Sequence, residues 1–335
     1  MKQSKQIMLG IAGVLAVGSA LLVSLWLFSV YVPQNSQTTK SVIVQVAPGD
    51  SVAQIGQKLR QDDLVSSAFI FTLYARFSGK GDRLIPGTYA LKGSMNIPQI
   101  VDYFASGRVA ARKVVVPEGY TVAKISKLWN QTGFGASDEF VRAASKQYDY
   151  DFLPQPSKAV KYQVEGYLFP ATYQVSVNAT AESFIRQMLD AFEAQAAPVI
   201  KANNTSGLKS MSEVVTLASV VELEANDAVN RAKVAQVFLN RLAKGIPLQS
   251  DVTVNYATGK SNTAASDIVT KSPYNTYVVA ALPPGPICSP GIEAIEAVLK
   301  PTKTDDLFFL AGRDGQVYYA KTLQEHNKNI ERYLK

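Results

Sequence analysis

The chain has 335 residues, of which 47% are apolar, so it is long and apolar enough to build more than one folded core. Its formal net charge is +7, but lysines and arginines are spread along the chain, which argues against a dedicated nucleic-acid groove. A single cysteine, Cys288, and a single histidine, His326, exclude an intrachain disulfide and a zinc site built from His and Cys. We expect no metal or organic cofactor.

The N-terminal part holds an uncharged apolar run, residues 7–32, preceded by Lys2 and Lys5. As a helix, about 26 residues rise roughly 39 Å, enough to cross a hydrocarbon core of roughly 30 Å. The lysines place residues 1–6 in the cytoplasm and the rest of the chain outside. A cleaved signal peptide is the alternative, but its apolar region has only about 7–15 residues, and no A-x-A-like site follows here. We expect a single-pass plasma-membrane anchor, then a linker at 33–41.

Residues 42–110 are predicted to form a small α+β domain. Valines alternate along 42–46 as in a strand, and a Pro-Gly-Asp turn leads into a helix whose apolar side chains share one face. The remaining expected elements are a helix over 69–77, an extended stretch from 86 and a helix over 97–104.

The pattern of strand, turn and helix recurs within residues 111–160, which we assign to a second such unit and a connector. The matching motifs are Gly49-x-Ser51-Val52-Ala53-x-Ile55 and Gly119-x-Thr121-Val122-Ala123-x-Ile125. Two copies suggest one supersecondary unit used twice, which is too few for a solenoid. The first copy resembles the start of a LysM module, a small glycan-binding fold. A generic α+β packing unit explains the pattern equally well.

A mixed α+β catalytic domain is expected over 161–335. Polar, aromatic and Gly/Pro-rich motifs surround two strong helices, 212–223 and 227–244, and such loops on a rigid scaffold commonly carry sites. The motifs at 245–256, 272–277 and 282–287 supply amide, hydroxyl and tyrosine groups in rigid loops. Sugars need these groups, because hydroxyls are bound by hydrogen bonds and C–H faces stack on aromatic rings.

Two glutamates, Glu222 and Glu224, follow an almost wholly apolar helical segment. At about 100° per residue, positions two apart lie on nearly opposite faces, so the carboxyls are not expected to share one site. A carboxyl held against apolar neighbours loses hydration, which raises its pKa and keeps it protonated for general-acid work. The alternative is that both glutamates end a core helix in solvent.

Seven motifs, taken in order, resemble the endolytic murein transglycosylase (YceG-like) family. They are Glu165-Gly166-Tyr167-Leu168-Phe169-Pro170-x-Thr172-Tyr173, Ala218-Ser219-Val220-Val221-Glu222-x-Glu224, Val237-Phe238-Leu239-Asn240-Arg241-Leu242, Leu248-Gln249-Ser250-Asp251, Ser272-Pro273-Tyr274-Asn275-Thr276-Tyr277, Leu282-Pro283-Pro284-Gly285 and Glu325-His326-Asn327. The resemblance implies a lyase that cleaves the β-1,4 bond between N-acetylmuramic acid and N-acetylglucosamine in nascent peptidoglycan. It further implies 1,6-anhydro ends and a part in setting strand length. Ala171, Val252 and Val317 depart from the family's usual Asp, Pro and His.

By this resemblance Glu222 is the catalytic acid and base, protonating the glycosidic oxygen and then deprotonating the muramic C6 hydroxyl. Glu224 is expected to be an orienting or structural partner of Arg231 or Arg241, and Glu165 a cleft residue or a helix-cap partner. The expected sugar contacts are Gln249, Asp251, Tyr256, Tyr274, Asn275, Tyr277 and Glu165.

His326 could serve a nucleophilic triad with a serine and Asp251, but no Gly-x-Ser-x-Gly motif is present, so we expect a structural hydrogen bond. Two other functions stay open: a non-catalytic wall-binding or division scaffold, and a hydrolase that releases reducing ends. Expected partners are peptidoglycan strands, the plasma membrane, and synthases or division proteins, with no nucleic acid. If the source has an outer membrane, the catalytic domain is periplasmic.

Overall fold

The computed structural model describes residues 2–36, 40–203 and 206–335, with side chains described from Gly13 onward. The fold is mixed α+β, as predicted. The chain divides into two compact units. The smaller is Met1–Arg112 with Gln174–Asn178, and the larger is Lys113–Tyr173 with Ala179–Lys335.

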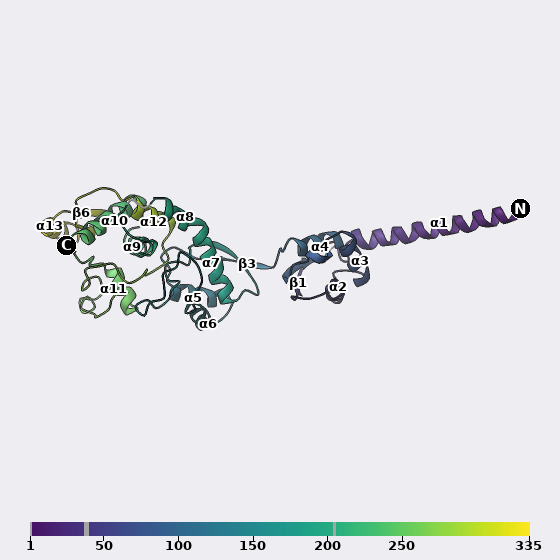
Figure 1. Ribbon diagram of the computed structural model, residues 1–335, viewed down its shortest axis with the longest axis horizontal. Helices are drawn as coiled ribbons and strands as arrows, with labels where there is room; N and C mark the ends of the chain where they lie inside the picture. Colours follow the sequence, from purple (N-terminus) through teal and green to yellow (C-terminus); the bar gives the residue numbers. More distant parts are fainter. Residues whose placement is uncertain (1, 37–39, 204–205) are drawn as a thin grey trace. The chain divides into compact units, whose positions relative to one another are not determined.

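The smaller unit contains one long helix and a small α+β core (Figure 1). Its elements are α1 (Lys2–Tyr31), β1 (Ser41–Val46), α2 (Val52–Gln61), α3 (Ala68–Phe77), the 3₁₀ turn η1 (Gly81–Arg83), β2 (Gly87–Lys92) and α4 (Ile97–Ala105). Within α1, Gly13–Tyr31 is long and apolar enough to cross a membrane, which agrees with the expected apolar N-terminal helix. The strand and helices expected within 42–104 are all present.

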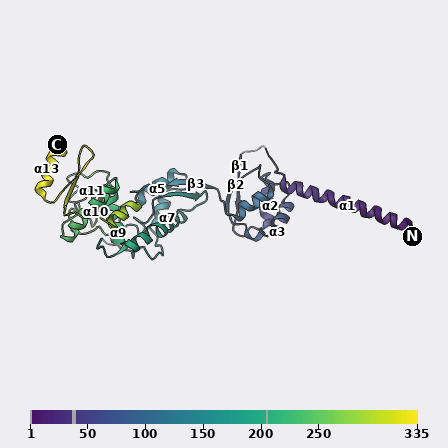
Figure 2. The same ribbon diagram turned by 90° about the horizontal axis from the view of Figure 1, so that it is seen from above.

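The core of the smaller unit lies between an antiparallel strand pair and three helices. β1 pairs with β2 from Ser41↔Lys92 to Val46↔Gly87. Figure 2 shows α2 and α3 on one side of this pair, the side from which α1 leaves. The buried cluster between the two layers is centred on Leu59, Phe71, Tyr89 and Phe104.

The two sequence copies fold in the same way at their turns. Gly49 and Gly119 both adopt positive φ, +89° and +72°, a conformation that glycine reaches without a Cβ clash. Ser51 then caps α2, and Thr121 caps α5 (Val122–Gln131), each by accepting a backbone N–H three residues on. The predicted repeat of strand, turn and helix is therefore confirmed as local structure.

The larger unit is mostly helical and is built around a buried helix. Its further elements are α6 (Ser137–Ala144), α7 (Ala181–Gln195), α8 (Ala197–Asn203), α9 (Met211–Glu224), α10 (Ala228–Ala243), α11 (Asp251–Thr258), α12 (Ile292–Leu299), β5 (Phe308–Ala311), β6 (Val317–Ala320) and α13 (Leu323–Tyr333). Two more strands, β3 (Ala111–Val115) and β4 (Thr172–Ser176), pair with each other, and the division between the units runs through both.

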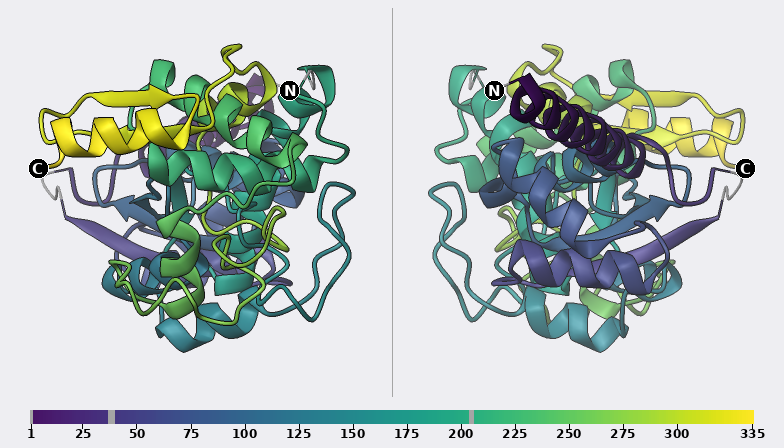
Figure 3. Two further views of the ribbon diagram at one scale, coloured as in Figure 1. Left: turned by 90° about the vertical axis from the view of Figure 1, so that its left-hand side faces the viewer. Right: turned by 90° about the vertical axis from the view of Figure 1, so that its right-hand side faces the viewer.

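Helix α9 is apolar around most of its circumference, and neighbouring helices cover it. Residues 214–222 are all buried, and α8, α10, α11 and α12 pack against the helix. Figure 3 shows the hairpin β5–β6 beside α13, in yellow. This enclosure fixes the direction of the carboxyl groups at the end of α9.

Candidate active site

The two glutamates at the end of α9 lie in different surroundings, as their helical spacing predicts. Glu222 is 8% exposed and has a buried cation beside it. Arg231 Nη2 donates to Glu222 Oε1 over 2.8 Å, and the backbone N–H of Gly291 donates to Oε2 over 2.9 Å. Both oxygens of Glu222 are therefore occupied by donors.

Arg231 is itself held from several directions. Its Nε donates to the carbonyl of Ala225 over 3.1 Å, and its Nη1 donates to Glu293 Oε2 over 2.7 Å. Burial raises the pKa of Glu222, while the Gly291 N–H and the Arg231 cation favour its charged form. This ion pair ties the end of α9 to α10 and to the start of α12.

Glu224 has a hydroxyl partner and no cationic partner within the residues described. Ser250 Oγ donates to Glu224 Oε1 over 2.5 Å. Burial raises the pKa of Glu224, the Ser250 hydrogen bond opposes the rise, and the charge of Asp251 adds to it. The residue as a whole is partly exposed, whereas Glu222 is buried. The predicted pairing of Glu224 with Arg231 or Arg241 was wrong, because Arg231 pairs with Glu222 and Arg241 with backbone carbonyls.

Two loops distant in sequence meet beside Glu224, held together by Thr276. The N–H of Gln249 donates to the carbonyl of Thr276 over 3.0 Å, and the N–H of Ser250 donates to its hydroxyl over 3.1 Å. The hydroxyl of Thr253 lies 2.8 Å from that of Thr276. The motifs at 248–251 and 272–277 thus form one wall next to the carboxyl.

Gln249, Asp251 and Tyr277 present polar groups on this wall. Arg241 Nη1 donates to Gln249 Oε1 over 3.1 Å, and Tyr277 Oη donates to Asp251 Oδ1 over 2.8 Å. Gln249 has a φ of +52°, an uncommon conformation for a residue with a side chain, and such strain gathers at functional sites. Gln249 and Asp251 are exposed, so both can meet a ligand.

The other predicted sugar contacts form a more buried group. Glu165 is 1% exposed, with Oε1 accepting from the N–H of Val122 over 2.9 Å and Oε2 from Tyr256 Oη over 3.1 Å. It therefore caps the start of α5, the second of its two predicted roles. Burial raises the pKa of Glu165 to about 7. The ring of Tyr256 packs against that of Tyr274 with centroids 4.9 Å apart, and burial raises the pKa of Tyr274 to about 12.

Asn275 is fully buried, and its side-chain amide forms hydrogen bonds with backbone groups of its own loop. Its Nδ2 donates to the carbonyls of Ile268 and Thr270, and its Oδ1 accepts from the N–H of Tyr277. Because both ends of the amide are occupied, the expected direct contact of Asn275 with a sugar has no support in this geometry. The side chain shapes the loop instead.

His326 lies on α13 and stacks on Phe308, with ring centroids 5.2 Å apart. Its Nδ1 is buried without a hydrogen-bond partner, so the structural hydrogen bond predicted for this residue was not found at that atom. Burial and the nearby Arg241 cation lower the pKa of His326. Asp251, the acid of the rejected triad, is engaged by Tyr277.

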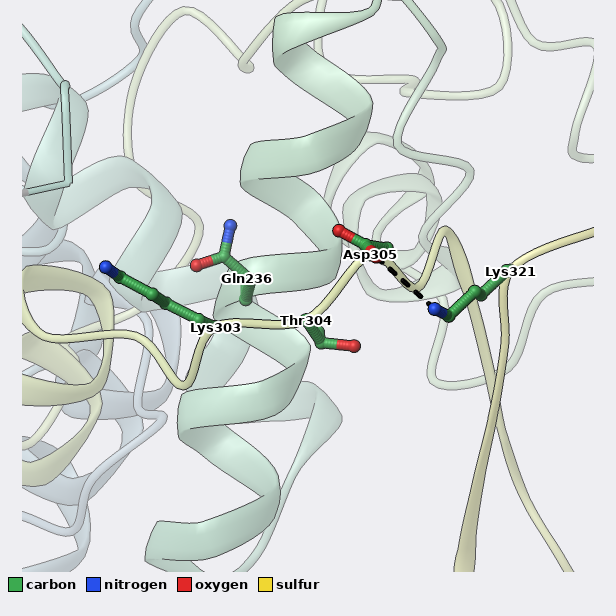
Figure 4. A pocket seen from close by; sticks show the side chains of 5 residues that line it. All are labelled: Gln236, Lys303, Thr304, Asp305 and Lys321. Carbon is green, nitrogen blue, oxygen red and sulfur yellow. Dashed lines mark hydrogen bonds and ion pairs between the residues drawn. The ribbon is translucent and has the colours of Figure 1, made fainter.

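A separate open pocket of about 460 Å³ lies beside α10 (Figure 4). Its lining residues include none of the predicted site residues, and an ion pair between Lys321 and Asp305, 3.3 Å long, crosses one side of it. The full lining is Gln236, Lys303, Thr304, Asp305 and Lys321. Over the described ranges, no group of three or more His, Cys, Asp or Glu residues could hold a metal ion.

Three residues that organise the site were not predicted from the sequence: Ser250, Thr276 and Gly291. Ser250 and Thr276 lie inside motifs that had been singled out, and a hydroxyl next to Asp251 was the available signal. Arg231 was predicted as a carboxylate partner, but of Glu224 and not of Glu222. Nothing local marks Gly291, whose N–H reaches Glu222 from 69 residues away.

Comparisons with known proteins identify relatives of this chain. Residues 44–332 match the model of the YceG-like family. The chain is 34% identical over 317 residues to the endolytic murein transglycosylase of Bacillus subtilis strain 168, covering 90% of this chain and 87% of that protein. It is 32% identical over 332 residues to the endolytic murein transglycosylase of Streptococcus pneumoniae serotype 2 strain D39, covering 90% of this chain but only 60% of that longer protein.

A solved structure shares the fold. The crystal structure of a yceG-like protein from Listeria monocytogenes aligns with a TM-score of 0.58 and 36% sequence identity. The alignment covers 86% of this chain and 98% of the Listeria chain. The likeness therefore includes most of both molecules.

Proposed function

The chain belongs to the YceG-like family, and we propose that it is a membrane-anchored endolytic transglycosylase that cuts the glycan strands of peptidoglycan. The names of its relatives support this reaction class, and so does the wall of amide, carboxyl and phenol groups beside Glu224. The single observation that carries the proposal is the Glu224 carboxyl, which is desolvated, accepts a hydrogen bond from Ser250 and has no cationic partner in the described residues.

Our proposal assigns the general acid to Glu224 in place of Glu222. The acid must present a proton to the glycosidic oxygen, and both oxygens of Glu222 already accept from fixed donors. Loss of the Glu222 charge would also leave the buried Arg231 without its buried carboxylate partner. Glu224 receives one donor on Oε1, so a proton on Oε2 can face a substrate.

The cleavage step needs no second carboxylate and no water. The Glu224 proton moves to the glycosidic oxygen as the bond between that oxygen and the anomeric carbon breaks, which frees the 4-hydroxyl of the next sugar. The muramic C6 oxygen then bonds to the anomeric carbon, and its proton returns to the Glu224 carboxylate. Positive charge at the anomeric carbon is met by the substrate's own N-acetyl oxygen, unlike in most hydrolytic glycosidases.

Gln249, Asp251 and Tyr277 are the sugar contacts that this proposal favours. Their polar groups line the wall beside Glu224, and the hydrogen bonds from Arg241 and Tyr277 hold Gln249 and Asp251 in place before a ligand arrives. Tyr274 and Tyr256 supply ring surface for stacking in the same larger unit. Orienting hydrogen bonds and flat aromatic surface are the two features a glycan cleft needs.

The proposal includes a single-pass anchor, with the N-terminus in the cytoplasm and the chain that follows α1 outside. The apolar stretch Gly13–Tyr31 and the lysines before it support this topology. A cysteine at exposed Gln57, in a chain with Cys288→Ser, would be labelled in intact cells by a membrane-impermeant maleimide. Labelling only after the membrane is permeabilised would reverse the topology.

Two finer parts of the proposal concern biology. The smaller unit is a LysM-like module, and cleavage inside nascent strands sets their length near peptidoglycan synthases. The sequence likeness over residues 44–59 supports the first part. An enzyme tethered where new strands emerge fits the second.

The test is mass spectrometry of the products released from uncross-linked glycan strands by the full-length protein. A transglycosylase yields 1,6-anhydromuramic ends that are one water lighter than hydrolysis products and resist borohydride reduction. Reducible ends would identify a hydrolase. Strand binding without any cleavage would support a scaffold and refute the enzymatic proposal.

A further inference from the structure

The smaller unit carries an apolar face on α3 that no described residue covers. Phe69 and Phe77 are 72% and 80% exposed, although Phe71 on the same helix is fully buried in the core. At about 100° per residue, Phe69, Arg76 and Phe77 fall within roughly 100° of one another around the helix. We call these three residues the α3 face. Single exposed apolar residues are ordinary, but two phenylalanines on one ten-residue helix form a coherent surface.

This face belongs to the part of the unit that packs on the end of α1. Side chains along α1 are exposed from Val14 to Leu25, but the indole nitrogen of Trp26 is buried and Val30 is 0% exposed. Both α3 and α4 contact α1. The small core thus begins to cover α1 about one turn before the helix ends.

The junction between α1 and the small core is fixed by hydrogen bonds. Asn96 Nδ2 at the start of α4 donates to the carbonyl of Tyr31 over 3.4 Å, and the N–H of Asn35 donates to the carbonyl of Gly93 over 3.1 Å. These contacts join the small core to the end of the helix that is proposed to cross the membrane.

The length of α1 places this junction at the membrane surface. The apolar run over residues 7–32 rises roughly 39 Å as a helix, more than the hydrocarbon core of roughly 30 Å, so a tilted helix crosses the core and its last turns reach the outer interface. Trp26 and Tyr31 then lie at the outer interface, where such rings are favoured. Because α3 packs on these same last turns, α3 lies at the level of the interface too.

We propose that the α3 face binds the outer leaflet of the membrane, with Phe69 and Phe77 in the interfacial layer and Arg76 at the lipid phosphates. Aromatic rings gain by leaving water at that depth, and a long cationic side chain extends toward the headgroups. The inference rests on the membrane anchoring of the proposed function but not on glycan cleavage. The small unit is then held on the bilayer by two contacts, the spanning helix and the α3 face.

The test is the depth of spin labels on the full-length protein in vesicles of phosphatidylethanolamine and phosphatidylglycerol. Labels go on single cysteines in a Cys288→Ser chain, at Phe69→Cys and Phe77→Cys. The water-side control is Ile43→Cys, 58% exposed on β1, whose outer face turns away from the helices. The membrane-side control is Leu22→Cys, 70% exposed on α1.

We expect labels at 69 and 77 to collide more with oxygen than with a water-soluble nickel complex, as at 22, while the label at 43 shows the reverse. Labels at 69 and 77 that resemble the one at 43, with 22 still in lipid, would overturn the inference and leave the anchor standing. A water-exposed label at 22 would refute the anchor itself. Close spin–spin coupling between copies at 69 or 77, without lipid contact, would assign the α3 face to self-association and also overturn the inference.

Discussion

Removing the charge of Glu222 should destabilise the larger unit and spare the chemistry. Arg231 and Glu222 have side chains only 8% and 5% exposed and lie 2.8 Å apart. Breaking a buried ion pair from one side costs about 3–5 kcal/mol, and because Glu293 still pairs with Arg231 we expect Glu222→Gln to cost about 3 kcal/mol. In a domain of about 150–250 residues, a loss of that size lowers the unfolding midpoint by about 6–12 °C.

The assay is thermal unfolding followed by the fluorescence of Trp129, which is buried in the larger unit, in a chain where Trp26→Phe removes the other tryptophan signal. The matched control is Glu293→Gln. The Glu293 side chain is 59% exposed, so losing its pair with Arg231 should cost at most about 1 kcal/mol. Glycan cleavage by Glu222→Gln is measured below its own transition. A variant as stable as the wild type but without turnover would refute the structural role of Glu222 and restore it as the acid.

Three further predictions address single groups. Ser250→Ala removes the donor that lowers the pKa of Glu224, so the alkaline limb of the pH–rate profile moves up and kcat falls about tenfold; an unchanged profile would contradict the contact. Glu165 has its pKa raised to about 7 in the folded chain, so it stabilises the fold at acid pH, and stability falls by about 3 kcal/mol as the pH rises from about 4.5 to 7. Glu165→Gln should flatten that dependence in urea titrations, and a slope equal to the wild type would refute it. Gly49→Ala should cost the smaller unit about 1–2 kcal/mol in urea unfolding, since φ is +89° and the space around it is open, so only backbone strain acts; no loss would disprove the strain.

Local structure could be read from the sequence because its causes are local. Ser51 and Thr121 cap their helices three residues away, and the glycines before them set the turns. Helical rotation was enough to predict that Glu222 and Glu224 face different surroundings. Each of these inferences depends on residues within one turn of chain.

The choice between the two glutamates could not be read in the same way. Glu222 is occupied by Arg231, 9 residues on, and by Gly291, 69 residues on, while Glu224 meets Ser250 across 26 residues. These partners are set by the packing of α10 and α12 on α9, which no local pattern encodes. Motif resemblance pointed to this segment, and the difference in surroundings on which our proposal rests comes from the packing.

Residue type alone gave a wrong expectation where a polar side chain forms its hydrogen bonds with nearby backbone groups. An amide such as Asn275 suits a sugar, but here it binds the carbonyls of Ile268 and Thr270 within its own loop. Glu165, for which a cleft role and a helix-cap role had both been predicted, binds the backbone of α5. Chemistry alone could nominate both residues for a site, and burial decided what they do.

The central claim is tested most directly by strand cleavage with Glu224→Gln and Glu222→Gln, assayed side by side with strand binding as the control for folding. Removing a general acid costs about 10²–10⁴ in rate, so Glu224→Gln should bind strands and release no anhydro ends in the time the wild type needs for completion. Glu222→Gln should still release them below its unfolding transition. Cleavage by Glu224→Gln at the rate of the wild type would contradict the assignment of the acid to Glu224.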